Sequence, residues 1–512
     1  MASRMKRELR TRSGCRKCRE RRVKCPEQRP ICGHCKRLGF TCRYEVKLSW
    51  QNVVSFEYDD HVLRGLPEDL LVSIQSWMFL NTSQADFNLN NSQADLKDNV
   101  DSFSSIRAED IQPEVDVLAP YPHYLSPFRM GEAEGYLWSY FNDCMTPQIV
   151  IDPSFNPYRD IILRMATYSR DGPLFHCVLA AAANQLQSTG RNEYENVMWL
   201  HRAKALRLLR TSINQLALET HNKSHDVPKD HVIASTIMLT FFEIAKDCSD
   251  SWTIHADFAR RFLSSRLRDR GSLDAEQEAL LYFAVTYFVS HDILAATGGT
   301  LMGATEMVTG MCKAVDKSTV LALTGCSRDL LILISEINQM SSLVKEPGQK
   351  QLSPTIQQRR DDVERLLHQL HQDVPEKFGS FQSEFTIVAE VKRLAAMLYL
   401  YSRIDGAGPH EPHVVRITSQ ILALVPKISL RTHTGLWPLF IVATLGIRPE
   451  CDEDRKLLLN RLAALQQTRQ LGSVKKARLI IEDVWKSRDL RPNISQGWSI
   501  LQGRRHGAIS LA

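Results

Sequence analysis

The sequence predicts two domains, a small metal-stabilised module at the N-terminus and a large all-α domain of stacked antiparallel helices. Six cysteines crowd the first 42 residues at regular spacing, in a segment too short to build a hydrophobic core of its own. From about residue 126 to 490, apolar residues recur with the 3.6-residue period of helices, and alternating strand patterns are scarce. With 512 residues and 43% hydrophobic content, the chain is long enough to bury a sizeable core in this larger part.

The cysteine-rich segment repeats one pattern twice. The spacing is Cys-x2-Cys-x6-Cys, then six residues, then the same pattern again, which places the cysteines at Cys15, Cys18, Cys25, Cys32, Cys35 and Cys42. Closely spaced thiolates select zinc, which prefers four tetrahedral ligands. Two zinc ions need eight bonds to ligands, so six cysteines suffice only if two of them bridge both ions. The 17-residue offset between the halves makes Cys15 and Cys32 equivalent, and we predict that these two are the bridges.

Basic side chains fill the gaps between these cysteines. Residues 1–47 carry 16 Lys or Arg against 4 Asp or Glu, a charge of +12 in a chain of +6, so residues 48–512 carry −6. This asymmetry confines polyanion binding to the N-terminus and favours DNA as the partner. A solvated helix face is the alternative for the basic run, and a zinc store or redox switch is the alternative for the thiols. Neither alternative needs a strict repeat with interleaved arginines.

The six cysteines, with Arg19, Lys24 and the Arg29-Pro30 pair, resemble the fungal zinc binuclear-cluster (Zn2Cys6) DNA-binding domain. The resemblance implies that a short helix after the first cysteine pair enters the major groove and reads a CGG-like triplet. Basic residues three and four positions after the second cysteine contact the bases in that family, and here they are Arg21 and Arg22. An arginine fork donates two hydrogen bonds to guanine, which suits such a target. We assign phosphate contacts to Arg16, Lys17, Arg19, Lys24, Lys36 and Arg37.

The composition changes over residues 45 to about 125, and we expect a linker there that is partly disordered and acidic. Its apolar positions do not sustain heptads, so no coiled coil is visible and homodimer formation stays open. The stretch Pro67–Leu80 fits one amphipathic helix. Residues 83–118 hold eight acidic and two basic side chains around a few spaced hydrophobic ones. Disordered activation segments and ordinary disordered linkers both have this composition.

Helical periodicity dominates residues 126–490. Asp274 is expected as an N-cap with Gln277 three residues later, and the apolar residues up to Thr297 run almost all the way round the helix, which indicates burial. The other predicted helices cover about residues 173–187, 193–217, 229–246, 250–267, 327–344, 355–372, 384–403, 412–425, 452–469 and 473–487. We therefore expect one all-α domain of stacked antiparallel helices.

Several short sequence segments in this helical part, taken in order, resemble the fungal-specific transcription factor domain of the second type. They are Leu174–Ala182, Arg202–Leu209, Ser251–His255, His291–Thr297, Thr324–Cys326, Leu394–Leu400 and Trp437–Phe440. The resemblance covers about 350 residues, and it implies a domain that regulates activity through effectors or partners and is not an enzyme. The fold class predicted for the whole chain is a zinc binuclear-cluster domain followed by a large all-α regulatory domain.

The sequence lacks the metalloprotease His-Glu-x-x-His motif, the phosphate loop, the dinucleotide glycine fingerprint and the nucleophile elbow. His176-Cys177 is the one pair with nucleophile-and-base chemistry, and its apolar helix favours packing. His255 and His291-Asp292 are interpreted as core polar groups, or as part of an effector pocket between helices. The cysteines outside the cluster, scattered singly, indicate reduced core residues. No segment approaches the roughly 20 apolar residues that cross a bilayer, so we expect no membrane partner.

These observations predict a nuclear, sequence-specific transcription factor for RNA polymerase II genes. The resemblance alone implies that it is an activator of metabolic or secondary-metabolite pathways, as is usual in that family. Its partners would be double-stranded DNA with CGG-like triplets, a second copy of the chain, and an effector or co-regulator at the helical domain. The alternative is a co-regulator tethered electrostatically to nucleic acid, with a protein-binding or metabolite-sensing helical domain. The predicted parts are a basic arm (1–12), the zinc cluster (13–44), the linker (45–125), the helical domain (126–490) and a C-terminal tail (491–512).

Overall fold

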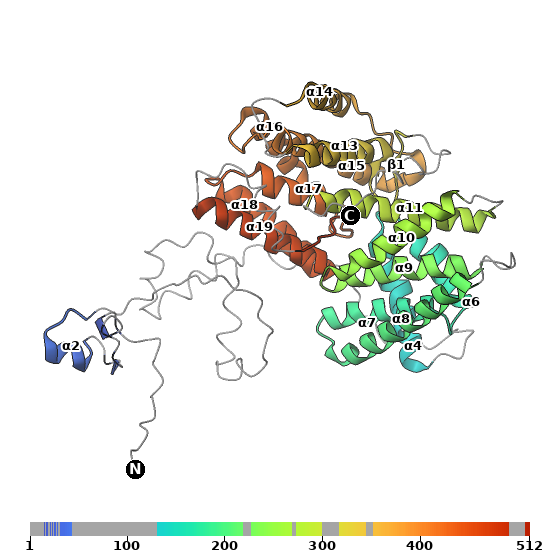
Figure 1. Cartoon of the computed structure of the whole chain (residues 1–512), viewed down its shortest axis with the longest axis horizontal. Coiled ribbons are helices and arrows are strands. Elements are labelled where there is room, and N and C mark those ends of the chain that lie inside the picture. Colours follow the sequence, from blue (N-terminus) through green and yellow to red (C-terminus); the bar gives the residue numbers. More distant parts are fainter. Residues whose placement is uncertain are drawn as a thin grey trace, which may run out of the picture. The chain divides into compact units, whose positions relative to one another are not determined.

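The computed structural model divides the chain into two compact units, residues 1–78 and 79–512, each taken here by itself (Figure 1). The predicted basic arm and linker, including the helix expected over Pro67–Leu80, lie outside the residues that the structure describes. The described residues are 15, 17, 18, 21, 23, 25, 26, 28, 31–42, 131–218, 227–268, 273–298, 317–344, 352–490 and 507–512.

The N-terminal unit contains the helix α2, Gly33–Leu38, beside a cluster of cysteines. At the start of α2 the Cys32 Sγ accepts a hydrogen bond from the Cys35 N–H, at 3.4 Å. Gly39 ends the helix with a φ of 66°, a left-handed conformation that glycine adopts without steric cost. Cysteines take the place of a hydrocarbon core here: Cys15, Cys18, Cys25, Cys32 and Cys35 are buried together, with Cys42 packed against them.

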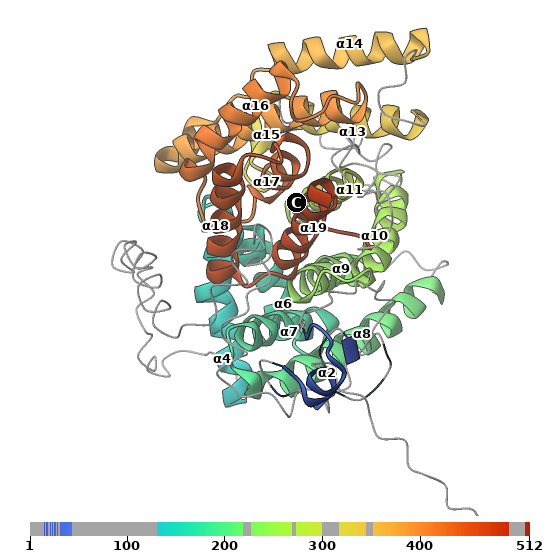
Figure 2. The ribbon, with the colours of Figure 1, turned by 90° about the vertical axis from the view of Figure 1, so that its left-hand side faces the viewer.

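Helices are the regular elements of the second unit over its described residues, apart from one short hairpin, which confirms the predicted all-α class. Its first part stacks α7, α8, α9 and α10 at one end of the domain, as the two ribbon views show (Figures 1 and 2). The elements of this part are α4 (Glu132–Tyr140), η2 (Phe141–Met145), α5 (Thr146–Ile149), η3 (Tyr158–Leu163), α6 (Arg164–Tyr168), α7 (Pro173–Ser188), η4 (Asn192–Tyr194), α8 (Glu195–Leu218), α9 (Val227–Lys246) and α10 (Ser251–Arg268).

The middle part places α13, α14, α15 and α16 at the opposite end, with α11 between the two stacks (Figures 1 and 2). The hairpin pairs β1 with β2 in antiparallel register, Val320 with Ser327 and Leu321 with Cys326. The elements are α11 (Ala275–Ala296), β1 (Val320–Leu321), β2 (Cys326–Ser327), α13 (Arg328–Leu343), α14 (Pro354–Gln369), η5 (Glu376–Phe381), α15 (Gln382–Arg403), α16 (Pro412–Leu424) and η6 (Val425–Lys427).

The last part joins the two stacks, because α19 contacts α9 on one side and α17 and η7 on the other. It comprises α17 (Leu436–Ile441), η7 (Val442–Gly446), α18 (Asp452–Arg469) and α19 (Gly472–Leu490). The helices that periodicity predicts between residues 173 and 490 are all present, whereas α4 to α6 and α17 with η7 were not predicted.

Helix α11 is the central core helix. Asp274 and Gln277 form the expected capping box, with the Gln277 N–H 2.8 Å from the Asp274 carboxylate and the Asp274 N–H 3.2 Å from the Gln277 side chain. The expectation that no segment approaches the length and apolarity of a bilayer span is wrong for α11, which meets both criteria. Of the long apolar stretch of α11, 78% is buried inside the domain, as expected for a helix that is apolar on all sides.

Three fully buried tryptophans join distant segments, and each indole N–H has a hydrogen-bond partner. Trp437 Nε1 donates to Thr297 Oγ1 at 3.0 Å, which fixes α17 against the end of α11. Trp485 Nε1 donates to the Ala443 carbonyl at 2.7 Å, joining α19 to η7. The third, Trp252, donates to the carbonyl of Ala508 at 3.5 Å. These three bonds tie α10, α11, α17, η7, α19 and the last described residues to one core.

Residues 507–512 insert into this core, next to α11 and α19 (Figures 1 and 2). Ile509 and Leu511 are fully buried, and the Ser510 N–H contacts Cys248 Sγ at 3.3 Å. The Lys476 ammonium holds the segment by donating to the Ala508 carbonyl at 2.8 Å. The predicted boundaries place residues 491–512 in a tail outside the helical domain. In the structure residues 508–511 are buried, because their mostly apolar side chains fill space between helices.

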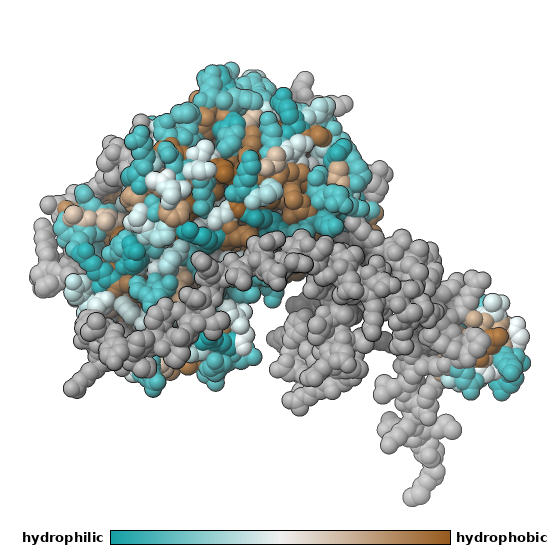
Figure 3. Space-filling model, turned by 180° about the vertical axis from the view of Figure 1, so that it is seen from behind, coloured by the Kyte–Doolittle hydropathy of each residue, from teal (hydrophilic) through white to brown (hydrophobic). Residues whose placement is uncertain are grey.

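Hydrophilic side chains predominate on the face of the helical domain that Figure 3 presents, with hydrophobic ones in small groups among them. The cysteines outside the cluster are free, and they do not all share the core environment that we predicted. Cys177, Cys248 and Cys326 are buried, but Cys144 and Cys451 are only half-buried because their segments lie near the surface. Cys312 lies outside the described residues.

Gly472 marks a close approach between two helices, and replacing it with alanine is expected to destabilise the domain. A Cβ at this position would lie 2.6 Å from the backbone of Asp247, just after the end of α9. Forcing the two segments apart costs about 1–3 kcal/mol of unfolding free energy, measured by chemical denaturation. Gly131→Ala is the matched control, since nothing lies within 4 Å of the added atom. Equal effects of both substitutions would contradict the close-approach interpretation.

Candidate metal centre and nucleic-acid interface

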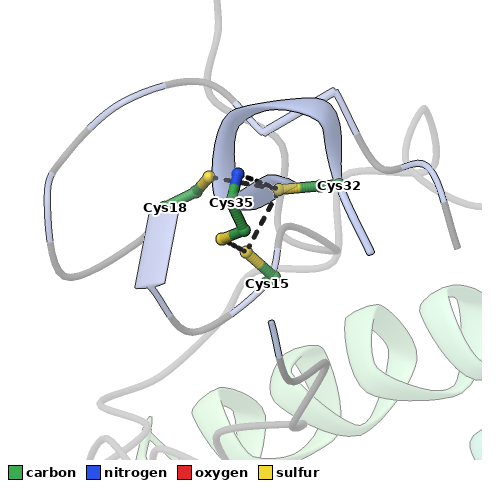
Figure 4. Close-up of side chains that lie close together, drawn as sticks. All are labelled: Cys15, Cys18, Cys32 and Cys35. Carbon is green, nitrogen blue, oxygen red and sulfur yellow. Dashed lines mark hydrogen bonds between the residues drawn. The ribbon is translucent and has the colours of Figure 1, made fainter. Parts of the chain in front are cut away.

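Four cysteine sulfurs converge on one point (Figure 4). The Sγ atoms of Cys15 and Cys32 are 3.7 Å apart, those of Cys15 and Cys35 are 3.6 Å apart, and those of Cys18 and Cys32 are 3.7 Å apart. All four sulfurs lie within 4.8 Å of one another. Sulfur ligands about 2.3 Å from a tetrahedral zinc lie about 3.8 Å from each other, so these separations fit ligands that share zinc ions.

The two halves of the cysteine repeat have equivalent local structures. The Cys15 N–H points to Cys25 Sγ at 3.4 Å, and the Cys32 N–H points to Cys42 Sγ at 3.3 Å, ten residues apart in each case. The first two cysteines of each half place their sulfurs in the central group of contacts. The 17-residue repeat in the sequence is therefore an internal repeat in three dimensions.

Packing thiolates this closely is unfavourable unless a cation compensates their negative charge. Loss of solvent raises the pKa of the Cys15 thiol and of the Cys18 thiol, and it raises the pKa of Cys35 to about 12. Desolvation also opposes ionisation of Cys32, but hydrogen bonds from the Cys35 backbone and from neighbouring thiols lower its pKa to about 6. Bound zinc would supply the missing positive charge to all of them as thiolates.

Comparison with protein families decides the class of this chain. Residues 136–511 match the model of the fungal specific transcription factor domain, and residues 13–51 match that of the fungal Zn(2)-Cys(6) binuclear cluster domain. The chain belongs to the fungal Zn(2)-Cys(6) transcription factors. It is a DNA-binding transcriptional regulator rather than an enzyme, and its cluster domain binds two zinc ions.

Relatives of this transcription factor are similar over very different lengths. An uncharacterised transcriptional regulatory protein, C965.10 of Schizosaccharomyces pombe, is 22% identical over 509 residues, covering 93% of this chain and 92% of its own. Adhesion and hyphal regulator 1 of Candida albicans is 29% identical over 125 residues, which are 24% of this chain and only 19% of that regulator. Sterol uptake control protein 2 of the same organism is 56% identical over 34 residues, 7% of this chain and 5% of its own. No solved structure matches the chain.

The cluster domain presents its described cations at the surface. Arg21, Lys36 and Arg37 are exposed and Lys17 is half-buried. The Arg21 guanidinium lies over the Phe40 ring, 5.3 Å from the ring centre. Lys36 and Arg37 occupy the last turn of α2, where cations interact favourably with the helix dipole. The remaining predicted DNA contacts, Arg16, Arg19, Arg22 and Lys24, lie outside the described residues.

Phe40 is a residue of this surface that sequence reasoning missed. Its ring is 41% exposed and contacts Arg21, and cation–π contacts of this kind contribute about 0.5–1 kcal/mol at exposed sites. The ring orients the arginine that we predict to contact bases. The sequence offers one weak signal, an aromatic residue exposed beside a cysteine ligand, but the pairing depends on the fold of the cluster.

The candidate catalytic residues of the helical domain are packed in its interior. Cys177 is fully buried, its Sγ contacts the Ser235 carbonyl at 3.7 Å, and burial raises the pKa of its thiol, which makes it a poor nucleophile. His176 does not activate it, because its Nδ1 lies 3.0 Å from Nδ1 of His201. The structure therefore favours packing for the His176-Cys177 pair.

Two of the other polar residues singled out by the sequence, His291 and Asp292, have partners inside the core. His291 Nδ1 is 2.7 Å from the Tyr287 carbonyl, and burial lowers its pKa to about 4. Asp292 pairs with Arg260 at 3.1 Å, while burial raises the carboxyl pKa to about 6. His255 is half-buried, and burial lowers its pKa. His291 lines a cavity of the described structure.

Among the described residues of the helical domain, an outer and an inner cavity differ sharply in size. The outer one has a volume of about 870 Å³ and is bordered by η3, the first half of α11 and the hairpin around Leu321. Apolar side chains form most of its lining, including Phe155, Phe283 and Phe378. The inner one has a volume of about 40 Å³ and is lined by His291, Tyr287 and Lys392. The outer cavity has the size of a small-molecule site, whereas the inner one holds only a few atoms.

Proposed function

We propose that this transcription factor is a nuclear activator of RNA polymerase II genes in a metabolic or secondary-metabolite pathway, and that it reads CGG-like triplets. The observation that carries the proposal is the cysteine cluster with Arg21 exposed beside it and oriented by Phe40. An exposed, oriented guanidinium can present two parallel donors to guanine O6 and N7. The activator role rests only on what is usual in the family.

In the proposed cluster, Cys15 and Cys32 bridge the two zinc ions. One ion takes Cys15, Cys18, Cys25 and Cys32, and the other takes Cys15, Cys32, Cys35 and Cys42. The contacts support this division, since Cys15 touches both Cys32 and Cys35, and Cys32 touches both Cys15 and Cys18. Each proposed bridge thus lies next to a terminal ligand of the opposite half.

Two kinds of contact to double-stranded DNA are proposed. Arg21 and Arg22 contact base edges and set the sequence preference. The positions of Lys36 and Arg37 at one helix end suit contacts to the DNA backbone, which set affinity and salt dependence. The full set of proposed phosphate contacts is Arg16, Lys17, Arg19, Lys24, Lys36 and Arg37.

The test is selection of bound sequences from random duplex DNA by the full-length, zinc-loaded protein, repeated with a chelator and at two salt concentrations. Enrichment of CGG-like triplets that disappears on chelation is the expected result, with a specificity ratio of about 10³ or more over random DNA. Paired triplets at a fixed spacing would report a homodimer, and single triplets a monomer. Salt-sensitive binding without an enriched motif would contradict the proposal.

A second function has support from the outer cavity of the helical domain, which is large and mostly apolar. In this alternative the protein is a co-regulator held on nucleic acid by charge alone, while its helical domain binds a metabolite or a partner protein. It predicts no enriched triplet in the selection, together with stabilisation of the helical domain by a small apolar molecule. The two outcomes of the selection separate the functions directly.

Arg21→Ala and Lys36→Ala are expected to change DNA binding in different ways. Loss of the Arg21 fork removes about 1–3 kcal/mol of discrimination at one base pair, or roughly fivefold to 150-fold, while binding to unrelated DNA changes little. Lys36→Ala weakens all sequences alike and reduces the slope of log affinity against log salt by about one. Titrations with triplet and scrambled duplexes at several salt concentrations measure both effects. Equal, sequence-independent losses would contradict the assigned roles.

A further inference from the structure

The inner cavity lies where most parts of the helical domain meet. Its walls come from α9, α11, α15, the hairpin turn at Thr324, the loop before α17, the start of α19 and Ala512. Its volume of about 40 Å³ is room for roughly three water-sized spheres. Most of its wall is apolar, and a few polar side chains, among them Lys392, Tyr287 and His291, are set into it. A binding site here therefore depends on those polar side chains.

Lys392 brings a cation into this cavity. Its side chain is 2% exposed, and Nζ donates to the Thr324 carbonyl at 2.5 Å. No carboxylate of the described residues forms an ion pair with it, whereas the buried Arg455 pairs with Asp489. A carbonyl satisfies one of the three ammonium donors but does not balance the charge. An uncompensated buried ammonium is costly, and burial lowers the pKa of Lys392.

Tyr287 adds a second donor to the same cavity. Its side chain is 3% exposed, and its hydroxyl has no hydrogen-bond partner within the described structure. The ring packs on His291, with 4.0 Å between ring centres, which holds the phenol in place. Because the Tyr287 carbonyl only accepts, His291 must donate to it from Nδ1, and in its neutral form the imidazole adds no charge. The cavity thus combines a cation, an unpaired hydroxyl and a neutral imidazole.

We propose that the inner cavity is a binding site for a small planar oxoanion, a carboxylate or carbonate of three or four non-hydrogen atoms, held between the Lys392 ammonium and the Tyr287 hydroxyl. The anion balances the buried charge, which water cannot do. Its oxygens accept from both donors at once. The volume excludes larger effectors, which the outer cavity would accommodate instead.

Occupancy of this site links segments that are far apart in the chain. Lys392 belongs to α15, Tyr287 and His291 belong to α11, and Ala512 comes from the inserted C-terminal segment. A bound anion therefore stabilises the assembled helical domain over any state in which these segments separate. The site makes the stability of the regulatory domain depend on the concentration of a small metabolic anion, and it does not depend on how the zinc cluster reads DNA.

The test follows thermal unfolding of the full-length, zinc-loaded protein at fixed pH and ionic strength. Sodium formate, acetate or bicarbonate replaces sodium chloride in increasing amounts. The expected result is a saturable rise in the midpoint of the helical domain, about 2 °C at ten times the dissociation constant. The three anions distinguish carboxylates from carbonate. No rise above that in chloride would overturn the proposal and leave a water-filled cavity.

Two substitutions and a control tie the effect to the cavity. Lys392→Met keeps an unbranched side chain of similar length, removes the charge, and is expected to abolish the saturable response. Tyr287→Phe removes only the unpaired hydroxyl, so it preserves folding and is expected to weaken anion binding about tenfold. Lys475→Met, on the exposed side of α19, should respond as the wild type does. The same response in wild type, Lys392→Met and Tyr287→Phe would show a general salt effect and overturn the proposal.

Discussion

Replacing Cys15 or Cys32 with alanine is expected to remove both zinc ions and at least a hundredfold of DNA affinity. Each thiol lies in the central group of sulfurs, and the contacts of Cys15 and Cys32 reach both halves of the cluster. A structural zinc site contributes about 10–16 kcal/mol to small zinc peptides, and this unit has cysteines where a core would be. Losing a bridge therefore unfolds the unit. Zinc content by chelator-dye titration and affinity for the selected duplex measure the two effects.

Terminal ligands provide the comparison that tests bridging. Cys25 and Cys42 each contact the backbone at the first cysteine of their own half. Alanine at either position is expected to remove one zinc ion, or to weaken it, while the other half keeps its ligands. Cys451→Ala, in the half-buried cysteine before α18, should retain both ions and full DNA affinity. Identical zinc losses from Cys15→Ala and Cys25→Ala would rule out the assignment of Cys15 as a bridge.

Replacing Ile509 with alanine is expected to cost the helical domain about 2–5 kcal/mol of unfolding free energy, a large effect for a position so near the end of the sequence. The side chain is fully buried, and its Cγ2 lies against Gly298 so closely that a Cβ there would be 2.6 Å away. Truncation leaves a cavity between α11 and the inserted segment. Chemical denaturation of the helical domain measures the loss.

A matched apolar residue outside the core controls for this prediction. Leu490 ends α19 with 81% of its side chain exposed, so Leu490→Ala is expected to change the unfolding free energy by less than about 0.5 kcal/mol. Removing residues 507–512 should cost more than Ile509→Ala, because Leu511 and the backbone contacts to Asp250 and Cys248 are lost as well. A truncated protein as stable as the full chain would show that the segment is dispensable.

The cysteine repeat made the metal centre predictable because zinc chemistry is local. Ligands three and ten residues apart must approach one another, and the cluster needs no other core. The orientation of Arg21 was not predictable, since it depends on Phe40, which lies in the second half of the repeat, between Cys35 and Cys42. The close thiol contacts between the halves likewise need the folded unit.

Most helices were predictable because their amphipathic or uniformly apolar pattern continues over many turns. The capping box of α11 is visible as Asp274 and Gln277, three residues apart. Two stretches escaped prediction for local reasons. Residues 132–168 form short helical pieces with π-helical turns, and prolines such as Pro147 and Pro157 interrupt their period. Residues 436–446 are buried on every side, so they show no polar face to mark a period.

By itself the sequence determined the zinc-cluster domain, the confinement of net positive charge to the N-terminus, and the all-α class, because each depends on spacing or composition along the chain. Only the tertiary structure decided which segments share a core. The contact from Lys392 to Thr324 joins residues 68 apart, and that from Ser510 to Cys248 joins residues 262 apart. Such contacts arise from the packing of many helices at once, whereas periodicity records only the immediate neighbours of each residue. For that reason residues 508–511, which the sequence places in a tail, are buried in the core. For the same reason Lys392, which the sequence places only in a helix, carries its charge into the inner cavity.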